Sequence, residues 1–191
     1  MASKTVSARF RNREPPAGLI YREDFLSPEE EAELVERIRS LPLKEFEFHG
    51  YLAKRRVISY GWRYRYDERS LQRADEIPEF LLGLRERAAI FAALPPADLA
   101  QALVTEYRPG TPIGWHRDKA VYGDVVGVSL LSSCVFRFRR KIGAGWERYS
   151  RVIDPRSAYL LRGPVRAEWE HSIPEVETLR YSITFRSLRR G

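Results

Sequence analysis

Short segments of alternating apolar and polar residues, each bounded by a turn signal, fill the second half of the chain and constrain its fold. The turn signals include Pro109-Gly110, Gly143-Ala144-Gly145 and Gly163-Pro164. Short strands that follow a helical N-terminal portion predict a jelly roll with helices packed on its outer face. We place these strands at residues 102–108, 113–117, 124–132, 134–141, 146–154, 157–162, 168–172 and 179–188.

The residues before these strands have a helical pattern. Ser27, Pro28 and Glu30 have the spacing of a capping box with proline in the first turn, which predicts a helix start. An edge strand over residues 18–25 precedes this helix, and a polar loop over residues 67–74 precedes the second helix. The apolar face of the first helix carries Leu34, Val35, Ile38 and Leu41. Pro78 is predicted to open a second helix, with its buried side formed by Phe80, Leu81, Leu84, Ala88 and Phe91.

Composition indicates a globular protein with an excess of positive charge. The 191 residues are enough for one domain, placed at residues 17–191, behind a flexible basic arm at residues 1–16. No segment resembles a signal peptide or reaches membrane-spanning length, and the single cysteine, Cys134, suits a reducing compartment. We therefore expect a cytoplasmic monomer without a membrane partner. The net charge of +7 and pI of about 9.7 favour a polyanionic partner, usually nucleic acid.

Two histidines and one aspartate form a candidate metal site. His116 and Asp118 are two residues apart, so on a strand their side chains point to the same face. A second imidazole from His171 would complete a facial triad, which binds non-haem Fe(II) and leaves positions open for substrate and oxygen. A His-x-Asp pair also occurs by chance, and a distant histidine is often a surface or core residue, so this spacing leaves both interpretations open.

Arg180 and Arg186 lie on one predicted strand with an even separation, so both point to one face. Tyr181, Ile183 and Phe185 point to the other face. An arginine aimed into a barrel interior needs an anionic partner. A dicarboxylate cosubstrate beside the metal would provide this partner; the alternative is a solvated edge strand with a basic face.

Residues 54–66 read as one strand with an aromatic and a basic face. One face carries Ile58, Tyr60, Trp62, Tyr64 and Tyr66, and the other carries Arg55, Val57, Ser59, Gly61, Arg63 and Arg65. One interpretation is a hairpin with its aromatic face on the core and its arginines solvated. The other is a lid over residues 50–66 that stacks aromatics on an unpaired base and brings arginines to phosphates. The candidate substrate contacts of such a lid are Arg55, Tyr60, Trp62, Arg63 and Arg65.

From about Gly18 to its C-terminus the chain resembles the AlkB family of Fe(II)/2-oxoglutarate dioxygenases. The matching segments, in the family's order, are Glu-Tyr-Arg-Pro-Gly (106–110), Trp-His-Arg-Asp-Lys (115–119), Val-Gly-Val-Ser-Leu (126–130), the surroundings of His171, and Arg-Tyr-Ser-Ile-Thr-Phe-Arg (180–186). Residues 54–61 also resemble the family's nucleotide-recognition lid, closest to the branch that hydroxylates modified wobble uridines in tRNA. The resemblance implies an α+β fold in which the jelly roll is a double-stranded β-helix.

The resemblance also implies roles for individual residues, with Fe(II), 2-oxoglutarate and O2 as cofactor and cosubstrates. Tyr107 and Arg180 would bind the distal carboxylate of 2-oxoglutarate, because a guanidinium matches its two oxygens. Arg186 would lie nearer the iron-chelating end of the cosubstrate or pair with a nearby acid. The implied iron ligands are His116, Asp118 and His171.

The implied reaction is oxidative demethylation or hydroxylation of a modified base in DNA or RNA, either in repair or in tRNA modification. Single-stranded or loop substrates avoid the cost of flipping the base out of a duplex. Two alternatives remain open: the same chemistry on a protein or small molecule, and a non-catalytic nucleic-acid-binding domain. The chain has Ala120 where the repair enzymes carry an acidic residue that contacts the damaged base. It also has Thr105 and Ser182 where those enzymes carry asparagine.

Overall fold

The structure, a computed structural model, describes residues 14–48, 51–65, 68 and 70–189. Within these residues the helices are α1 (Pro28–Arg39), α2 (Leu82–Phe91) and α3 (Gly163–Ala167), with 3-10 turns at Glu79–Leu81 and Pro96–Asp98. The strands are β1 (Leu19–Arg22), β2 (Lys44–Phe48), β3 (Tyr51–Tyr60), β4 (Trp62–Arg65), β5 (Ser70–Arg73), β6 (Gln101–Tyr107), β7 (Ile113–His116), β8 (Tyr122–Leu130), β9 (Cys134–Ile142), β10 (Gly145–Ile153), β11 (Ala158–Leu161), β12 (Glu170–Ile173) and β13 (Arg180–Leu188). No helix in this described part is long and apolar enough to cross a membrane.

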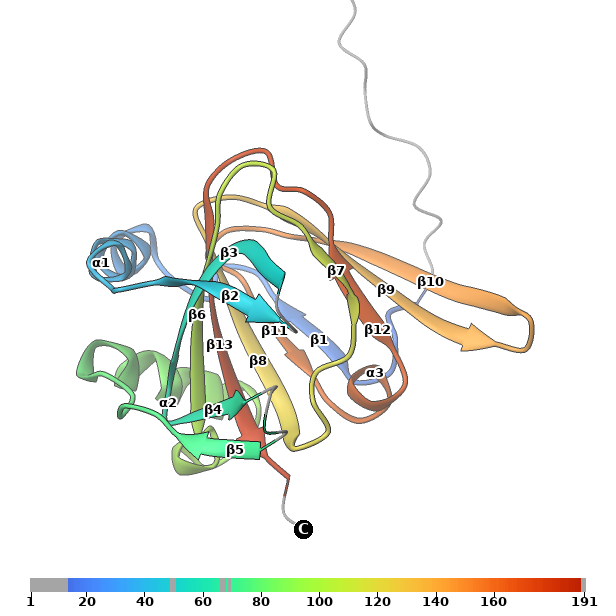
Figure 1. The fold of residues 1–191 in the computed structure, drawn as a ribbon, viewed down its shortest axis with the longest axis horizontal. Helices are drawn as coiled ribbons and strands as arrows, with labels where there is room; N and C mark the ends of the chain where they lie inside the picture. Colours follow the sequence, from blue (N-terminus) through green and yellow to red (C-terminus); the bar gives the residue numbers. More distant parts are fainter. Residues whose placement is uncertain (1–13, 49–50, 66–67, 69, 190–191) are drawn as a thin grey trace, which may run out of the picture.

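In the described residues these strands form two antiparallel sheets and a separate hairpin. The large sheet has the order β1-β11-β8-β13-β6-β3-β2, the small sheet has the order β10-β9-β12-β7, and β4 pairs with β5. Helices α1 and α2 lie on one side of this β-structure, and the β9–β10 hairpin projects from the other (Figure 1). The α+β jelly roll is therefore confirmed, and every strand predicted after residue 101 is present with bounds that differ by at most two residues.

Helix α1 begins where the capping box predicts. The Ser27 hydroxyl accepts a hydrogen bond from the Glu30 amide at 3.2 Å, and the Glu30 carboxylate accepts one from the Ser27 amide at 2.7 Å. A cap of this kind stabilises a helix by about 1 kcal/mol. The apolar faces of α1 and α2 then pack with the large sheet in one cluster, which includes Ile38, Leu84, Tyr181, Ile183 and Phe185.

A second apolar cluster, which includes Phe136, Phe138 and Tyr159, lies between the two sheets. Strand β13 separates the two clusters because its side chains alternate in direction. Its apolar residues face the helices, as predicted, and its polar residues, Arg180 and Arg186 among them, face the space between the sheets. The inner side of β13 therefore carries cationic side chains into the interior of the jelly roll.

The segment predicted as one strand over residues 54–66 is instead two strands, so that prediction is wrong. β3 ends at Tyr60 and β4 begins at Trp62, because the chain turns at Gly61 with φ of +74°. A Cβ atom at Gly61 would lie 2.1 Å from the Ala100 carbonyl oxygen, so only glycine fits the turn.

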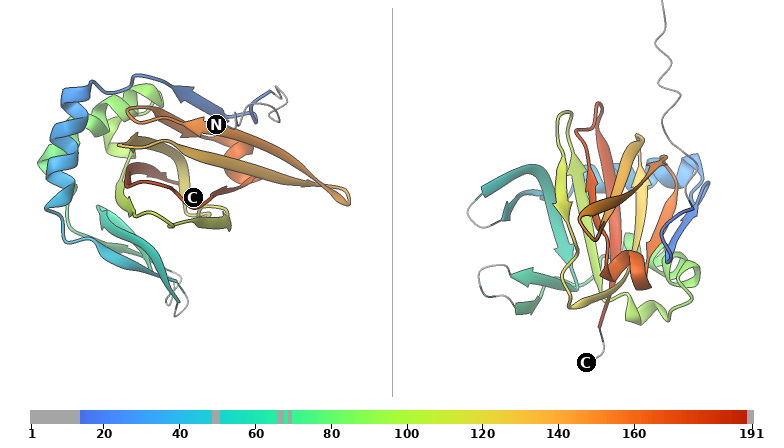
Figure 2. Two further views of the ribbon diagram at one scale, coloured as in Figure 1. Left: turned by 90° about the horizontal axis from the view of Figure 1, so that it is seen from above. Right: turned by 90° about the vertical axis from the view of Figure 1, so that its right-hand side faces the viewer.

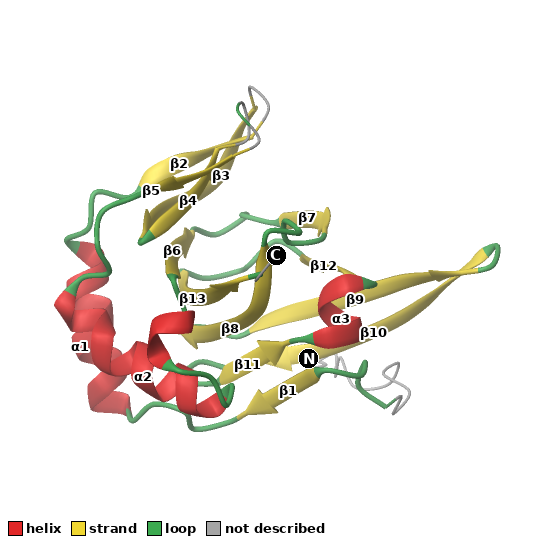
Figure 3. Cartoon of the chain, turned by 90° about the horizontal axis from the view of Figure 1, so that it is seen from below, coloured by secondary structure: helices red, strands yellow, loops and turns green. Residues whose placement is uncertain are grey.

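Two further elements differ from the sequence-based expectation. Strand β5 lies within the predicted loop at residues 67–74 and pairs with β4 in a separate hairpin (Figure 3). Helix α3 begins at Gly163-Pro164, which we interpret from sequence as a turn. Tyr66 and, apart from residues 14–16, the predicted basic arm lie outside the described residues.

Candidate metal centre and cosubstrate site

A cavity of about 1120 Å³ lies between the inner side of the large sheet and strands β7 and β12 of the small sheet, with β4 and β5 beside it. Several predicted site residues line it: Arg55, Arg63, Arg65, Tyr107, His116, Asp118, His171 and Arg186. Arg180, Tyr60 and Trp62 are not part of the lining. The structure therefore brings the three candidate metal ligands together with part of the predicted lid.

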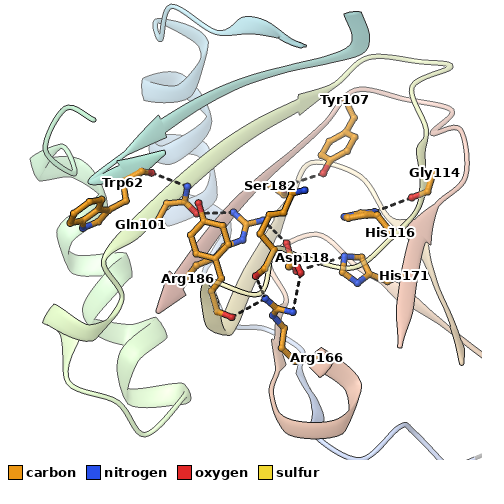
Figure 4. A network of polar contacts seen from close by, with 12 residues as sticks. Trp62, Gln101, Tyr107, Gly114, His116, Asp118, Arg166, His171, Ser182 and Arg186 are labelled. Atoms are coloured by element: carbon orange, nitrogen blue, oxygen red, sulfur yellow. Dashed lines mark hydrogen bonds and ion pairs between the residues drawn. The ribbon is translucent and has the colours of Figure 1, made fainter. Parts of the chain in front are cut away.

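The two histidines meet across neighbouring strands. His116 of β7 pairs in register with His171 of β12, and their ring centres are 4.3 Å apart. The Nε2 atom of His171 lies 3.8 Å from Oδ2 of Asp118. One ligand atom from each of the three residues lies within 4.8 Å of the others, a grouping that can hold a metal ion (Figure 4).

Asp118 reaches this group from outside the strand. Strand β7 ends at His116, so the prediction that both residues share a strand face is wrong. The next residues are instead held by Arg166 of α3, which is almost fully buried. Arg166 donates to the backbone carbonyls of Asp118 at 3.3 Å, of Lys119 at 2.6 Å and of Tyr122 at 2.8 Å. The carboxylate and the imidazoles are therefore brought together by tertiary anchoring of the backbone.

Burial and charge set the protonation of the three side chains. Burial lowers the pKa of His171 to about 3 and also lowers the pKa of His116. Burial alone would raise the pKa of the Asp118 carboxyl, but Arg186 together with His171, His116 and Arg166 outweighs this effect and holds the pKa well below its usual range. At neutral pH the group consists of two neutral imidazoles and one carboxylate, the forms that bind a divalent metal.

Arg180 has an unused donor in the interior. Only 1% of this residue is exposed, its Nε donates to Ser129 Oγ at 3.2 Å, and its guanidinium carbon lies 4.8 Å from the centre of the Tyr107 ring. Its Nη1 has no hydrogen-bond partner in the described part of the chain. A buried guanidinium with neutral neighbours requires an anion, and the two oxygens of a carboxylate match its donors. The donor set therefore fits a carboxylate cosubstrate.

Arg186 connects the candidate metal ligands to the β4–β5 hairpin. It donates from Nη2 to Asp118 Oδ1 at 3.2 Å and from Nη1 to Gln101 Oε1 at 3.1 Å. The Gln101 amide then donates to the Trp62 carbonyl at 2.8 Å (Figure 4). Of the two expectations for Arg186, the structure shows the pairing with a nearby acid. Gln101 was not among the predicted residues, because its contact depends on the register of β6 against β13.

The predicted lid contributes basic side chains to the cavity. Arg55 of β3 and both Arg63 and Arg65 of β4 line it. Tyr64 lines it as well, with the Lys119 ammonium 5.2 Å from the centre of its ring. Cationic groups and an aromatic ring therefore lie in the same cavity as the candidate metal ligands.

Two aromatic residues of the predicted lid lie elsewhere. Tyr60 is buried in the cluster beneath the helices, and the Trp62 ring packs against the Arg73 guanidinium, with 4.5 Å from the ring centre to the guanidinium carbon. The turn at Gly61 breaks the alternation that would have put both rings on one face. The structure therefore does not support the prediction that Tyr60 or Trp62 contacts a base. Tyr64, which the sequence placed on the aromatic face but not among the substrate contacts, lines the cavity instead.

Comparisons with known proteins agree with this geometry. A family model described as the 2OG-Fe(II) oxygenase superfamily matches residues 18–186. An "Alkylated DNA repair protein ALKBH8 homolog" from Arabidopsis thaliana is 29% identical over 165 residues, which cover 73% of this chain and 48% of that protein. A "tRNA (carboxymethyluridine(34)-5-O)-methyltransferase alkbh8" from Xenopus tropicalis is 29% identical over 163 residues, which cover 83% of this chain and 25% of that protein. The chain thus spans about half or less of the length of these curated relatives.

A solved structure shares the fold. The structure of OsALKBH1 superposes with a TM-score of 0.68 at 17% sequence identity, over 92% of this chain and 98% of that chain. The family match over residues 18–186 indicates an oxygenase enzyme and not the alternative of a non-catalytic binding domain. The chain belongs to the 2OG-Fe(II) oxygenase superfamily as an AlkB-like member, an enzyme that uses Fe(II), 2-oxoglutarate and O2.

Proposed function

We propose that His116, Asp118 and His171 hold the Fe(II) of this oxygenase. Their ligand atoms lie within 4.8 Å of one another, and their protonation suits a divalent cation. Nδ1 of His116 lies 2.9 Å from the Gly114 carbonyl oxygen, so Nδ1 carries the proton and Nε2 is free to bind the metal. When bound, iron with 2-oxoglutarate and O2 supplies a two-electron oxidation of a substrate C–H bond, coupled to formation of succinate and CO2.

The distal carboxylate of 2-oxoglutarate is assigned to Arg180, whose buried Nη1 has a free donor. The Tyr107 hydroxyl, 3.4 Å from Ser182 Oγ, would donate to the same carboxylate. Tyr107 lines the cavity, and the guanidinium carbon of Arg180 lies 4.8 Å from the centre of its ring. Arg186 acts as the partner that keeps Asp118 ionised.

The substrate is proposed to be a modified base in a nucleic acid. The observation that carries this proposal is the set of basic side chains, Arg55, Arg63 and Arg65, that lines the same cavity as the metal ligands together with the Tyr64 ring. Arginines can contact the phosphates on either side of a base, and an aromatic ring can stack on the base itself. The two curated relatives carry names that refer to alkylated DNA and to tRNA, which is consistent with such a substrate.

Succinate release tests this function. The protein is loaded anaerobically with Fe(II) and 2-oxoglutarate and exposed to O2 with a panel of methylated single-stranded oligonucleotides and tRNA. We expect at least one nucleic acid to stimulate succinate release. Formaldehyde release would identify demethylation, because a hydroxylated N-methyl group breaks down to formaldehyde, whereas a hydroxylated carbon side chain remains as an alcohol. If no nucleic acid stimulates release from protein that binds iron and cosubstrate, the nucleic-acid substrate is wrong.

A further inference from the structure

The outer face of the small sheet, which points away from the cavity, carries aromatic and basic side chains. Strand β9 sends Phe136 and Phe138 into the core between the sheets, so Arg137 and Arg139 point outward. On β10, Trp146 lies opposite Lys141 and Arg148 lies opposite Arg139. We call this surface the Arg/Trp face; its members are Trp115, Arg137, Arg139, Lys141, Trp146 and Arg148.

Arg139 links the two edges of this face. Its guanidinium carbon lies 4.4 Å from the ring centre of Trp115 on β7 and 4.3 Å from that of Trp146 on β10, and these are the two edge strands of the small sheet. Arg139 also donates to the Glu170 carboxylate at 2.6 Å. Cation–π contacts of this kind fix the positions of the rings. Trp146 nevertheless remains 39% exposed, so part of the indole is open to a ligand.

The charge of the Arg/Trp face is strongly positive. Its four basic residues lie beside a single acid on the outer side of the sheet, Glu170, which is already paired with Arg139. Lys141 and Arg148 are exposed, and neither has an ion-pair partner in the described part of the chain. Soluble proteins usually intersperse charges of both signs on a solvated surface. A basic track with aromatic platforms is the arrangement that single-stranded nucleic acid binds.

This face is continuous with the cavity around one edge of the sheet. Strand β7 is that edge, with His116 on the inner side and Trp115 on the outer side. Arg117, the next residue, is exposed and lines the cavity. The opposite end of the face lies on the β9–β10 hairpin, which projects away from the helices (Figure 2, left). A chain that leaves the cavity past Arg117 therefore meets basic side chains and indoles as far as this hairpin.

We propose that the Arg/Trp face binds the single-stranded nucleic acid that flanks the base in the cavity. Lys141 and Arg148 contact phosphates of the strand, and Trp146 stacks on an unpaired base outside the active site. The proposal rests on the proposed function, because it assumes that the substrate is a nucleic acid. It adds a second contact surface on the opposite side of the small sheet from the candidate metal ligands.

Salt-dependent binding tests the phosphate contacts. The affinity of the full chain for a fluorescein-labelled single-stranded RNA of about 16 nucleotides is measured at several salt concentrations. For a single strand, the slope of log K against log salt changes by about 0.7 per phosphate contact. The double variant Lys141→Ala/Arg148→Ala should therefore make the slope shallower by about 1.4. The matched control is Arg37→Ala/Arg39→Ala at the end of α1, which removes the same charge on the far side of the molecule.

Trp146→Ala tests the stacking contact. It should raise Kd about tenfold with an unchanged salt slope, since stacking releases no counterions. None of these variants should change the affinity for a trinucleotide, which is too short to leave the cavity and reach the hairpin. A thermal melt of each variant verifies that it is folded.

Several outcomes would overturn the proposal. If the two double variants reduce the salt slope of RNA binding equally, RNA binding depends only on the net charge of the protein and not on the Arg/Trp face. Poly-L-glutamate that competes as well as RNA of equal charge would assign the face to acidic polypeptides. If Arg63→Ala/Arg65→Ala weakens RNA binding while the Lys141/Arg148 variant does not, the nucleic-acid function stands and the second surface is wrong. If the parent protein shows no salt-dependent affinity for single-stranded RNA or DNA, both the second surface and the nucleic-acid function are wrong.

Discussion

Replacing Arg180 by methionine should have opposite effects with and without 2-oxoglutarate. Without the cosubstrate, the guanidinium is buried among neutral groups and its Nη1 is unpaired. Replacing such an uncompensated charge by an apolar side chain of similar length removes its desolvation cost, so the substitution should leave the stability unchanged or raise it. With the cosubstrate, the variant loses the partner of a buried carboxylate, which weakens cosubstrate binding by about 2–5 kcal/mol. The Kd for 2-oxoglutarate should therefore rise by about 30-fold to several thousand-fold.

Thermal unfolding measures both effects on the same protein. In the parent, cosubstrate at about one hundred times its Kd adds about 2.7 kcal/mol to the free energy of unfolding. For a domain of this size that corresponds to a rise in Tm of about 5–11 °C. Arg180→Met should keep or raise the Tm of the cosubstrate-free protein and reduce the shift to about one third or less of the parent's, with a redox-inert divalent metal present throughout. A variant that is destabilised without 2-oxoglutarate and keeps the full shift would refute the reasoning, because Arg180 would then be structural.

Three other predictions concern the surroundings of the site. Arg166→Gln should weaken divalent-metal binding about 10- to 100-fold in calorimetry, because the backbone of Asp118 loses its anchor; an unchanged affinity would show that Arg166 does not position the ligand. Hydrogen bonds from Arg56 lower the pKa of the buried Glu106, so this carboxylate contributes stability above its ordinary pKa of 4.5 and loses it as the pH falls further. The difference in unfolding free energy between the parent and Glu106→Gln should therefore shrink in acid. A constant difference across pH would show that the ionised Glu106 carboxylate does not stabilise the fold. Gly61→Ala should lower the free energy of unfolding by about 1–3 kcal/mol, because the added Cβ would lie 2.1 Å from a carbonyl oxygen at a φ of +74°. A melting temperature within error of the parent's would show that the turn relaxes freely.

The features that sequence predicts well here depend on neighbouring residues. The capping box at Ser27 and the turn residues between strands are local signals, and the structure places the elements where these signals predict. The alternation along β13 correctly assigns Arg180 and Arg186 to one face, because a strand forces a period of two on any sequence. The proximity of His116, Asp118 and His171 is predicted from motif spacing and from the family resemblance together.

The features that sequence misses depend on contacts between distant parts of the chain. Asp118 lies beyond the end of its strand and is held by Arg166, almost fifty residues later, which no local pattern connects to it. The turn at Gly61 is required by the close approach of residue 100, so the alternation expected across it cannot persist. Gln101 joins the network through the register of two strands. Each of these contacts exists only once the sheets have packed.

Iron content measured together with succinate production tests the central claim most directly. The parent protein, loaded with Fe(II) without oxygen and freed of excess metal, should hold one iron per chain and release succinate from 2-oxoglutarate when O2 is added. His116→Ala, Asp118→Ala and His171→Ala should each remain folded, lose the iron and release no succinate, because each removes one ligand of the group. A folded variant among these three that keeps one iron per chain and releases succinate at the parent rate would contradict the account.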